Sequence, residues 1–550
     1  MFETVDAHFE DIIQERNYGT LTLTFNKADL ENIKTFYDFS SNPIVDITGL
    51  DKFTGLESLK LNNSDITDIS ALENLTNLKI LDLSNNKVSD ISALENLTNL
   101  QELNLSNKYG FSDMNQISDI SPLKNLTNLR ILDISYNENL SDISSLANLI
   151  NLEELSLSKK ELSSLDNNIR DISALKNLTN LKVLKLDHNL INNVESLENL
   201  TSLTYLNLKG NWITDISSLK NLTDLTYLNL DGGGNYVKDF GPLRNLTNLT
   251  YLNLNNSNTG DISPLENLTN LTELYLQNSS SLNRISDISA LEKLVNLKTL
   301  DLAFNYISDI SPLENKTNLT KLNLSYNEIS DVSPLKNLTN LTDLNLEYNQ
   351  LTDISSLKNL TNLKYLNIAI NKISDISVLT NLTNLKDLIL FYNKIRDLSQ
   401  LDNMQLERLE SEKAYYEFWD CPSNITYTTN PDGSVTVKIT SSEQLQYKDG
   451  WDMGSDEKSL TKTYNSNAKE IVRVLNTEGI AVEVEINVDS IRTVDDTTDE
   501  QKEENKGNTD DTQSDSPIPN AGSFIIPFAI LAGVIFVVNR RKLKSMRYIK

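Results

Sequence analysis

The sequence predicts an α/β solenoid with a curved parallel β-sheet, followed by a small β-sandwich. Three observations support this fold class. From residue 53 to residue 402 the chain repeats a pattern of leucines with a period of 22 residues. Each period contains one Leu-x-Leu segment, which is typical of a short strand. Residues 434–440 and 480–488 instead alternate apolar and polar side chains, as strands with one buried face do.

The period reads L-x-x-L-x-x-L-x-L-x-x-N-x-I-x-D-I-x-x-L-x-N and predicts a leucine-rich-repeat solenoid over residues 53–409. Strands from successive copies stack in parallel on the concave side, and short 3-10 or α segments form the convex side. Five copies are longer than the rest, and in four of them the extra residues clearly follow the strand. These insertions should therefore project from one edge of the sheet. The fifteen copies begin at residues 53, 75, 97, 126, 149, 178, 200, 222, 246, 268, 294, 316, 338, 360 and 382.

Three recurring polar patterns have structural interpretations. A buried amide ladder is expected where the chain turns inward, because it would satisfy backbone groups that no strand partner reaches. Its members are Asn86, Asn137, Asn189, Asn211, Asn305, Asn327, Asn349, Asn371 and Asn393. Convex segments begin with Ser-x-x-Glu pairs, which are typical of capping boxes. These pairs are Ser70 with Glu73, Ser92 with Glu95, Ser263 with Glu266, and Ser311 with Glu314. An Asp also precedes most convex segments, and turn capping is favoured over Ca²⁺ binding, because one carboxylate per repeat is few for this ion.

The regions around the repeats differ in composition. We expect an N-terminal cap at 1–52, with short helices at 6–15 and 27–34, and an Ig-like β-sandwich at 410–492. An acidic disordered linker at 493–522, a transmembrane segment at 523–539 and a basic cytoplasmic tail at 540–550 should follow. The uncharged run 524–538 is short for a membrane span, but it follows a disordered linker and has nothing to pack against. The positive-inside rule then places the bulk of the chain outside the cell.

Just before the apolar run lies the pentapeptide Ile518, Pro519, Asn520, Ala521 and Gly522. With the apolar run and the basic tail it resembles the LPxTG sorting signal of Gram-positive surface proteins, at which sortase attaches a chain to peptidoglycan. Ile518 replaces Leu and Ala521 replaces Thr, so both sortase processing and a retained membrane anchor stay open.

The repeat, the cap and the sandwich together resemble the internalin family of bacterial surface proteins. This resemblance implies a bacterial cell-surface location and recognition of a host or other surface ligand by the concave sheet. Met1 to Glu10 is acidic and has no apolar core, so we expect the true start of the exported protein to lie upstream.

Composition limits the other functions. The 77 acidic and 49 basic residues give a formal charge of −28, which argues against nucleic-acid binding. One cysteine, Cys421, and two histidines, His8 and His188, offer little to a metalloenzyme or a hydrolase. We therefore predict a protein that is not an enzyme and has no metal or cofactor.

Aromatic side chains that should point out of the sheet, or lie at its edge, are the candidate ligand-binding residues. They are Tyr205, Tyr227, Tyr251, Tyr275, Phe304, Tyr326, Tyr348, Tyr365 and Tyr392. Such rings supply contact area at low entropic cost. The alternative is that stacked rings only stabilise neighbouring strands.

The predicted function is therefore a surface adhesion module whose concave face binds a protein or glycan. Two alternatives remain. One is a regulatory scaffold of the intracellular type, since 22-residue leucine-rich repeats also occur in a protein-phosphatase regulatory subunit. The other is a structural wall spacer without a specific ligand.

Overall fold

The structure, a computed structural model, divides the chain into two compact units, residues 1–421 and 422–550. The residues that it describes are 32–37, 44–108, 114–161, 168–232, 234–278, 284–411, 424–432, 434–441, 444–445, 450–455, 457–466, 468–475 and 481–488. Several predicted features lie outside them: the helix at 6–15, Cys421, the linker, the sorting-like pentapeptide, the membrane segment and the basic tail.

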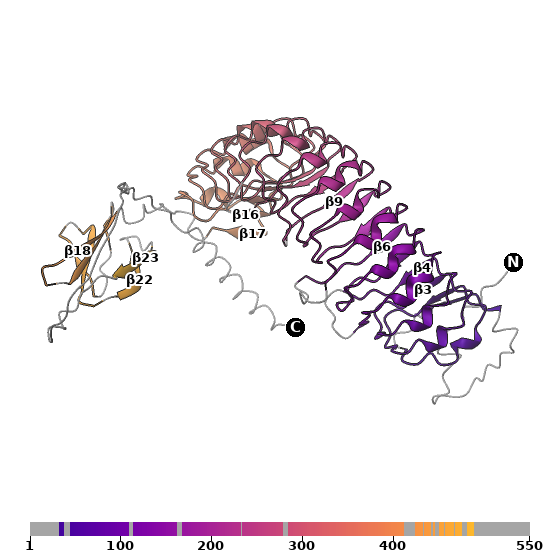
Figure 1. Cartoon of the computed structure of the whole chain (residues 1–550). Coiled ribbons are helices and arrows are strands. Elements are labelled where there is room, and N and C mark those ends of the chain that lie inside the picture. The colour runs from indigo at the N-terminus through magenta and orange to yellow at the C-terminus, as the bar shows by residue number, and fades with distance from the viewer. Residues whose placement is uncertain are drawn as a thin grey trace, which may run out of the picture. The chain divides into compact units, whose positions relative to one another are not determined.

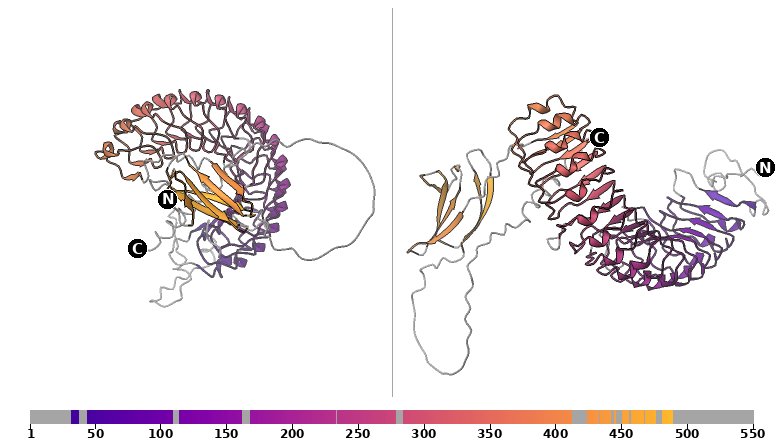
Figure 2. Two further views of the ribbon diagram at one scale, coloured as in Figure 1. Left: turned by 90° about the vertical axis from the view of Figure 1, so that its left-hand side faces the viewer. Right: turned by 90° about the horizontal axis from the view of Figure 1, so that it is seen from above.

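The first unit is a solenoid built on one parallel sheet of seventeen strands, β1 to β17, in chain order. Fifteen of them, β2 to β16, coincide with the fifteen predicted Leu-x-Leu segments, which confirms the leucine-rich-repeat fold. One further strand pairs at each end, β1 with β2 and β17 with β16. Figure 1 shows the short strands side by side, and Figure 2 shows the 3-10 segments on the outer side of the curve.

The strands are β1 (Thr35–Tyr37), β2 (Ser58–Lys60), β3 (Ile80–Asp82), β4 (Glu102–Asn104), β5 (Ile131–Asp133), β6 (Glu154–Ser156), β7 (Val183–Lys185), β8 (Tyr205–Asn207), β9 (Tyr227–Asn229), β10 (Tyr251–Asn253), β11 (Glu273–Tyr275), β12 (Thr299–Asp301), β13 (Lys321–Asn323), β14 (Asp343–Asn345), β15 (Tyr365–Asn367), β16 (Asp387–Ile389) and β17 (Arg408–Glu410). The 3-10 segments are η1 (Leu50–Lys52), η2 (Ser70–Leu72), η3 (Ser92–Leu94), η4 (Ser121–Asn125), η5 (Ser144–Asn148), η7 (Ser173–Asn177), η8 (Glu195–Leu197), η9 (Ser217–Asn221), η10 (Gly241–Leu243), η11 (Ser263–Leu265), η12 (Ser289–Leu291), η13 (Ser311–Leu313), η14 (Ser333–Asn337), η15 (Ser355–Asn359), η16 (Ser377–Asn381) and η17 (Ser399–Leu401).

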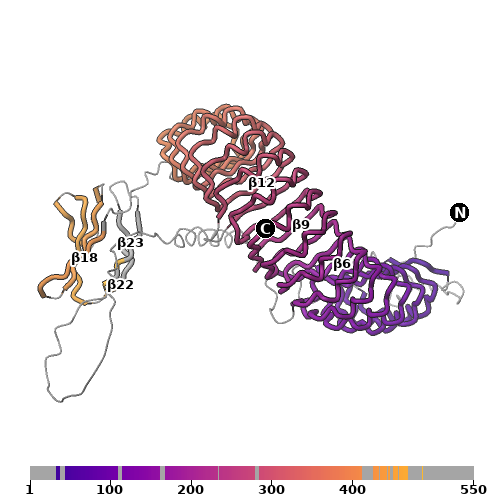
Figure 3. The backbone as a smooth tube through the Cα atoms, turned by 45° about the horizontal axis from the view of Figure 1, so that its top comes forward, coloured from indigo at the N-terminus to yellow at the C-terminus, as the bar shows by residue number. Residues whose placement is uncertain are grey.

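The core is one continuous layer of leucine and isoleucine between the sheet and the convex side. The central Leu of each strand from β2 to β16 is at most 2% exposed, while its two neighbours in the strand point to the other face of the sheet. Lys316, which replaces the leading Leu of its copy, is also buried, and its Nζ donates to Glu292 O over 2.8 Å. Figure 3 shows β6, β9 and β12 in successive turns of the same backbone coil.

The predicted Asn ladder is confirmed. Asn349 is buried, and its Nδ2 donates to the carbonyls of Leu324 at 2.9 Å and Leu346 at 3.2 Å. Its Oδ1 accepts the N–H of Ile329 at 3.0 Å. One side chain thus satisfies three buried backbone groups of two adjacent repeats.

The capping-box prediction is wrong. Ser70 is the first residue of its 3-10 segment rather than the residue before it, and its N–H donates to Asp68 Oδ1 over 2.8 Å. The recurring Asp therefore has the expected turn-capping role. This hydrogen bond holds the pKa of Asp68 below its usual range, as the equivalent bond from Ser311 does for Asp309.

The second unit contains two antiparallel sheets, as the period-two alternation predicts. One has the order β18-β19-β21-β20, and the other pairs β22 with β23. Their strands are β18 (Asn424–Thr429), β19 (Val435–Thr440), β20 (Asp452–Met453), β21 (Ser459–Tyr464), β22 (Ala468–Leu475) and β23 (Ala481–Val488). The β18–β19 turn is closed by Asn430, whose N–H donates to Ser434 O over 2.8 Å. Among the described residues, no helix has the length and apolar character needed to cross a membrane.

Candidate ligand-binding surface

The nine predicted aromatic residues fall into two ring stacks and one apolar patch along the sheet. The tyrosine stack is Tyr205, Tyr227, Tyr251 and Tyr275. The edge column is Phe304, Tyr326, Tyr348, Ile370 and Tyr392. The C-terminal patch is Tyr348, Tyr365, Ala369, Ile370, Ile389, Phe391 and Tyr392, so it shares three residues with the edge column. All nine side chains are half-buried rather than exposed, because each ring is partly covered by its neighbours.

The tyrosine stack follows the outward-facing positions of strands β8 to β11. The ring centroids of Tyr205 and Tyr227 lie 4.0 Å apart, and those of Tyr227 and Tyr251 lie 4.2 Å apart, in nearly parallel planes. Tyr275 is tilted against Tyr251 at 5.5 Å. Burial raises the pKa of Tyr227 and of Tyr251 to about 12, so the stack is uncharged at neutral pH.

The edge column lies where the chain leaves the strand and turns. Its five residues, one per repeat, are Phe304, Tyr326, Tyr348, Ile370 and Tyr392. All five have left-handed backbone, with φ of 59°, 56°, 54°, 55° and 54° respectively. The ring centroids of Phe304 and Tyr326 are 4.2 Å apart, and those of Tyr326 and Tyr348 are 4.8 Å apart.

The fold requires the left-handed conformation at this turn but not a bulky side chain. In upstream repeats the same turn is occupied by Asn63, Asn85, Gly210, Gly232 and Asn256, and in two separate repeats by Tyr136 and His188, at φ between 50° and 68°. Asn and Gly are the residues that adopt this conformation at least cost, whereas a residue with a large or β-branched side chain costs roughly 1–2 kcal/mol there. Five consecutive repeats therefore keep bulky residues where the backbone disfavours them.

The C-terminal patch is an apolar cluster separate from the leucine core. Ala369, Ile370 and Ile389 are buried at its centre. The half-buried rings of Tyr348, Tyr365, Phe391 and Tyr392 pack against them, and the rings of Phe391 and Tyr392 meet edge to face at 5.4 Å. An apolar cluster on the outward face of the sheet is a surface that a partner can cover.

Two partly buried acidic side chains lie beside the aromatic surfaces: Glu347 next to Tyr326, and Asp301 at the position opposite Tyr275 in the neighbouring strand. Glu347 Oε2 accepts from Asn367 Nδ2 over 3.0 Å, and Tyr326 Oη donates to Glu347 Oε1 over 3.5 Å. Burial raises the pKa of Glu347, and burial likewise raises the pKa of Asp301. In both cases burial makes the carboxylate less favourable than it is in water.

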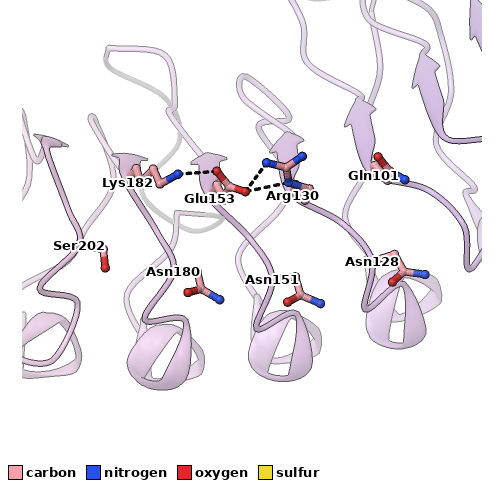
Figure 4. Close-up of a pocket in the computed structure, with 8 residues that line it drawn as sticks. All are labelled: Gln101, Asn128, Arg130, Asn151, Glu153, Asn180, Lys182 and Ser202. Carbon is pink, nitrogen blue, oxygen red and sulfur yellow. Dashed lines mark hydrogen bonds and ion pairs between the residues drawn. The ribbon is translucent and has the colours of Figure 1, made fainter.

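A polar pocket of 560 Å³ lies at the edge of the sheet opposite the edge column, just before the start of strands β4 to β7 (Figure 4). At its centre Glu153 accepts from Arg130 Nε and Lys182 Nζ, each over 2.7 Å, and these partners hold its pKa below the usual range. Asn128 and Asn151 donate to backbone carbonyls of the preceding repeats over 2.8 Å. The polar groups are thus used within the solenoid, and the pocket is a structural ladder.

Sequence reasoning missed several surface residues. Ile389 and Ile370 of the C-terminal patch carried a usable signal, because Ile389 occupies an outward position that is Asn367 one repeat earlier. Trp212 and Tyr236, which are 56% and 49% exposed, were also missed. Their signal is an aromatic residue after the ladder Asn, where most other copies have a polar side chain.

Comparisons with known proteins agree with the repeat architecture. A family model of a leucine-rich repeat region matches residues 163–383, and a model of two leucine-rich repeat copies matches residues 76–125 and 110–148. No curated protein sequence matches the chain.

Solved structures give further similarities. An internalin, InlF, from Listeria monocytogenes is 34% identical, with a TM-score of 0.49, over 62% of this chain and 89% of that one. A leucine-rich-repeat protein from Leptospira interrogans is 23% identical, with a TM-score of 0.53, over 73% and 94%. The plant peptide hormone receptor RGFR1, solved in complex with RGF2, is 20% identical, with a TM-score of 0.51, over 70% and 76%.

The last two similarities concern the fold alone. The family-model matches lie within the predicted repeat region, residues 53–409, and the parallel sheet has one strand for each predicted repeat and one more at either end. The chain belongs to the leucine-rich-repeat proteins.

Proposed function

We propose that this chain is a bacterial cell-surface protein that binds a protein ligand through its concave sheet and the edge column. One observation carries the proposal: five consecutive bulky residues occupy a turn where the backbone favours Asn or Gly. Strained conformations that the fold itself does not need are concentrated at functional sites. A ligand that covers these side chains supplies the reason for keeping them.

The chemistry of the surface favours a protein over a charged small molecule. The rings are half-buried and rigid, so they lose little entropy on binding, as the aromatic anchors of protein interfaces do. The C-terminal patch adds an apolar centre, and the tyrosine stack continues the aromatic surface along the sheet. Tyrosines with a raised pKa stay neutral and keep their hydroxyl donors at physiological pH.

The resemblance to internalins gives the proposal its cellular setting. We place the solenoid outside a Gram-positive cell, anchored by residues 518–522 and 523–539 to peptidoglycan or to the membrane. Receptor ectodomains share the leucine-rich-repeat fold, and one of them was solved with its peptide hormone. A spacer without a ligand would give no reason for strained aromatic residues at the sheet edge. An intracellular scaffold would fractionate with the cytosol rather than with the cell envelope.

The test is a screen of the full chain against an array of extracellular receptor ectodomains, followed by variants. The triple variant Tyr326→Asn, Tyr348→Asn and Tyr392→Asn removes three edge rings and leaves residues that accept left-handed backbone. We expect it to lose at least 30-fold in affinity for the selected receptor, since each anchor contributes about 1–2 kcal/mol.

The matched control changes the same turn in upstream repeats, with Asn63→Gly, Asn85→Gly and Asn256→Gly. This control should bind as the parent does. Unchanged binding by the tyrosine variant, or equal losses by both variants, would refute the proposed binding surface.

A further inference from the structure

A second surface lies on the same edge of the sheet, in repeats that precede the edge column. It is a groove of 660 Å³ where the chain leaves strands β6 to β10. Trp212 and Tyr236 line it, together with His188, Lys209, Asp231 and Asn256. Its volume lies within the range of about 300–1,000 Å³ that is typical of sites for small ligands.

The two rings occupy equivalent positions of neighbouring repeats. The Trp212 N–H donates to Ile191 O and the Tyr236 N–H to Ile213 O, each over 2.9 Å. In most other repeats the residue that makes this bond is polar, for example Lys87, Gln350 or Lys372, although Leu190 and Tyr306 also make it. The solenoid therefore does not need an aromatic side chain at this position, and both rings are about half exposed.

Glycines fix the indole and keep the groove open. A Cβ on Gly234 would lie 2.9 Å from Trp212 Cγ, so the indole rests directly against the backbone of the next repeat. Trp212 is 56% exposed, so much of its side chain is open to solvent despite this contact. The left-handed turn carries Gly210 and Gly232 here, at the position where the edge column has Tyr326 and Tyr348. Neither glycine has a side chain to cover the groove, and the His188 ring, from the same turn one repeat earlier, lies against Gly210.

Apart from Leu190, the remaining lining is polar and balanced in charge. It contains two lysines, Lys160 and Lys209, and two acids, Glu161 and Asp231, and Lys209 Nζ lies 3.1 Å from Asp231 Oδ2. The groove therefore offers no net field to attract an ionic ligand. Amide, hydroxyl and carboxylate groups beside the rings supply both donors and acceptors of hydrogen bonds.

The geometry points to an uncharged carbohydrate as the ligand of this groove. A pyranose ring has an apolar C–H face, which packs on the electron-rich face of an aromatic ring. Its hydroxyl groups donate and accept at the rim, which matches the mixed polar lining. This site is independent of the proposed protein-binding surface, because none of the edge-column residues lines it.

The experiment is saturation-transfer-difference NMR on the full chain with four neutral probes at 1 mM: tetra-N-acetylchitotetraose, cellotetraose, maltotetraose and lacto-N-tetraose. We expect saturation transfer to the ring C–H protons of at least one probe. Trp212→Ala and Tyr236→Ala should each weaken that binding at least ten-fold. Gly232→Asn should do the same by filling the groove, since a Cβ there meets only Asn256 Nδ2 at 3.6 Å and Asn accepts left-handed backbone.

Two controls define specificity. Tyr306→Ala removes an exposed ring from the same position of a later repeat, outside the groove, and should bind the probe as the parent does. Tyr348→Asn tests the other surface and should also leave sugar binding unchanged. Absence of transfer to all four probes, binding that persists in Trp212→Ala, or an equal loss in Tyr306→Ala would overturn the inference.

Discussion

The substitution Tyr348→Asn separates the two roles that the edge column can have. Tyr348 has φ of 54°, and replacing it with Asn should recover about 1 kcal/mol of backbone strain. The variant loses the ring stack on Tyr326, at 4.8 Å, which contributes about 0.5–1.5 kcal/mol. It also loses the burial of half a ring, which contributes about 1 kcal/mol. The free energy of unfolding should therefore fall by only about 1 kcal/mol.

Urea unfolding followed by far-UV circular dichroism measures this change. Leu346→Ala, in the core of the same repeat and 0% exposed, supplies the internal standard and should cost about 3 kcal/mol. If Tyr348→Asn costs as much as Leu346→Ala, the fold itself needs the ring. The column would then be a structural ladder, and the argument from strain to ligand binding would fail.

Three further predictions concern stability. Burial lowers the pKa of Lys159, whose Nζ donates to Asn137 O, to about 8, so the charged form is disfavoured in the folded state. The burial of this charge destabilises the folded state fully below pH 8 and no longer does so above the ordinary pKa of 10.5. Lys159→Met should therefore raise the free energy of unfolding at pH 7 by about 2 kcal/mol, once the loss of its hydrogen bond is subtracted. An increase of the same size at pH 10.5 would contradict this explanation. Asn371→Ala leaves four buried backbone groups without their hydrogen-bond partner, and it should lower the free energy of unfolding in urea by about 3 kcal/mol or more. A decrease below about 1 kcal/mol would be inconsistent with a stabilising Asn ladder. The hydrogen bond from the Ser355 N–H lowers the pKa of Asp353, so its stabilisation is present above the ordinary pKa of Asp and disappears as the pH falls through the lowered pKa. Asp353→Ala should therefore lower the urea midpoint at pH 7 but not at pH 2. Equal decreases at the two pH values would argue against a capping role.

The solenoid could be predicted from the sequence because each repeat must bury the same positions. A leucine at the centre of a strand and an Asn at the inward turn have one structural solution, so Leu344 and Asn349 lie where the period places them. The caps could not be assigned in this way. Ser-x-x-Glu and Asp-x-Ser overlap in the same segment, and the Asp oxygen already accepts the serine N–H. The sequence pattern alone does not decide whether the serine N–H donates to the preceding Asp or to the following Glu.

The candidate surfaces were only partly predictable, because their character depends on backbone conformation. Sequence periodicity places Tyr326 and Tyr348 in one column, but it does not reveal that their φ is positive, since aromatic residues seldom adopt that conformation. The groove was missed for a related reason. Trp212 becomes prominent only once Gly210 and Gly232 are seen to occupy the turn that tyrosines fill later in the chain.

One position per repeat therefore determines how the sheet edge meets its surroundings. The leucine positions cannot vary without opening the core, whereas the left-handed turn constrains only the backbone and leaves its side chain pointing outward. With glycine there, as at Gly210 and Gly232, the edge is hollow and exposes an indole that rests on the next repeat. With Tyr or Ile there, as from Phe304 to Tyr392, the edge becomes a continuous apolar wall. The two surfaces that we propose can thus differ although the repeats are nearly identical, because the residue at the left-handed turn, which distinguishes them, does not contribute to the core.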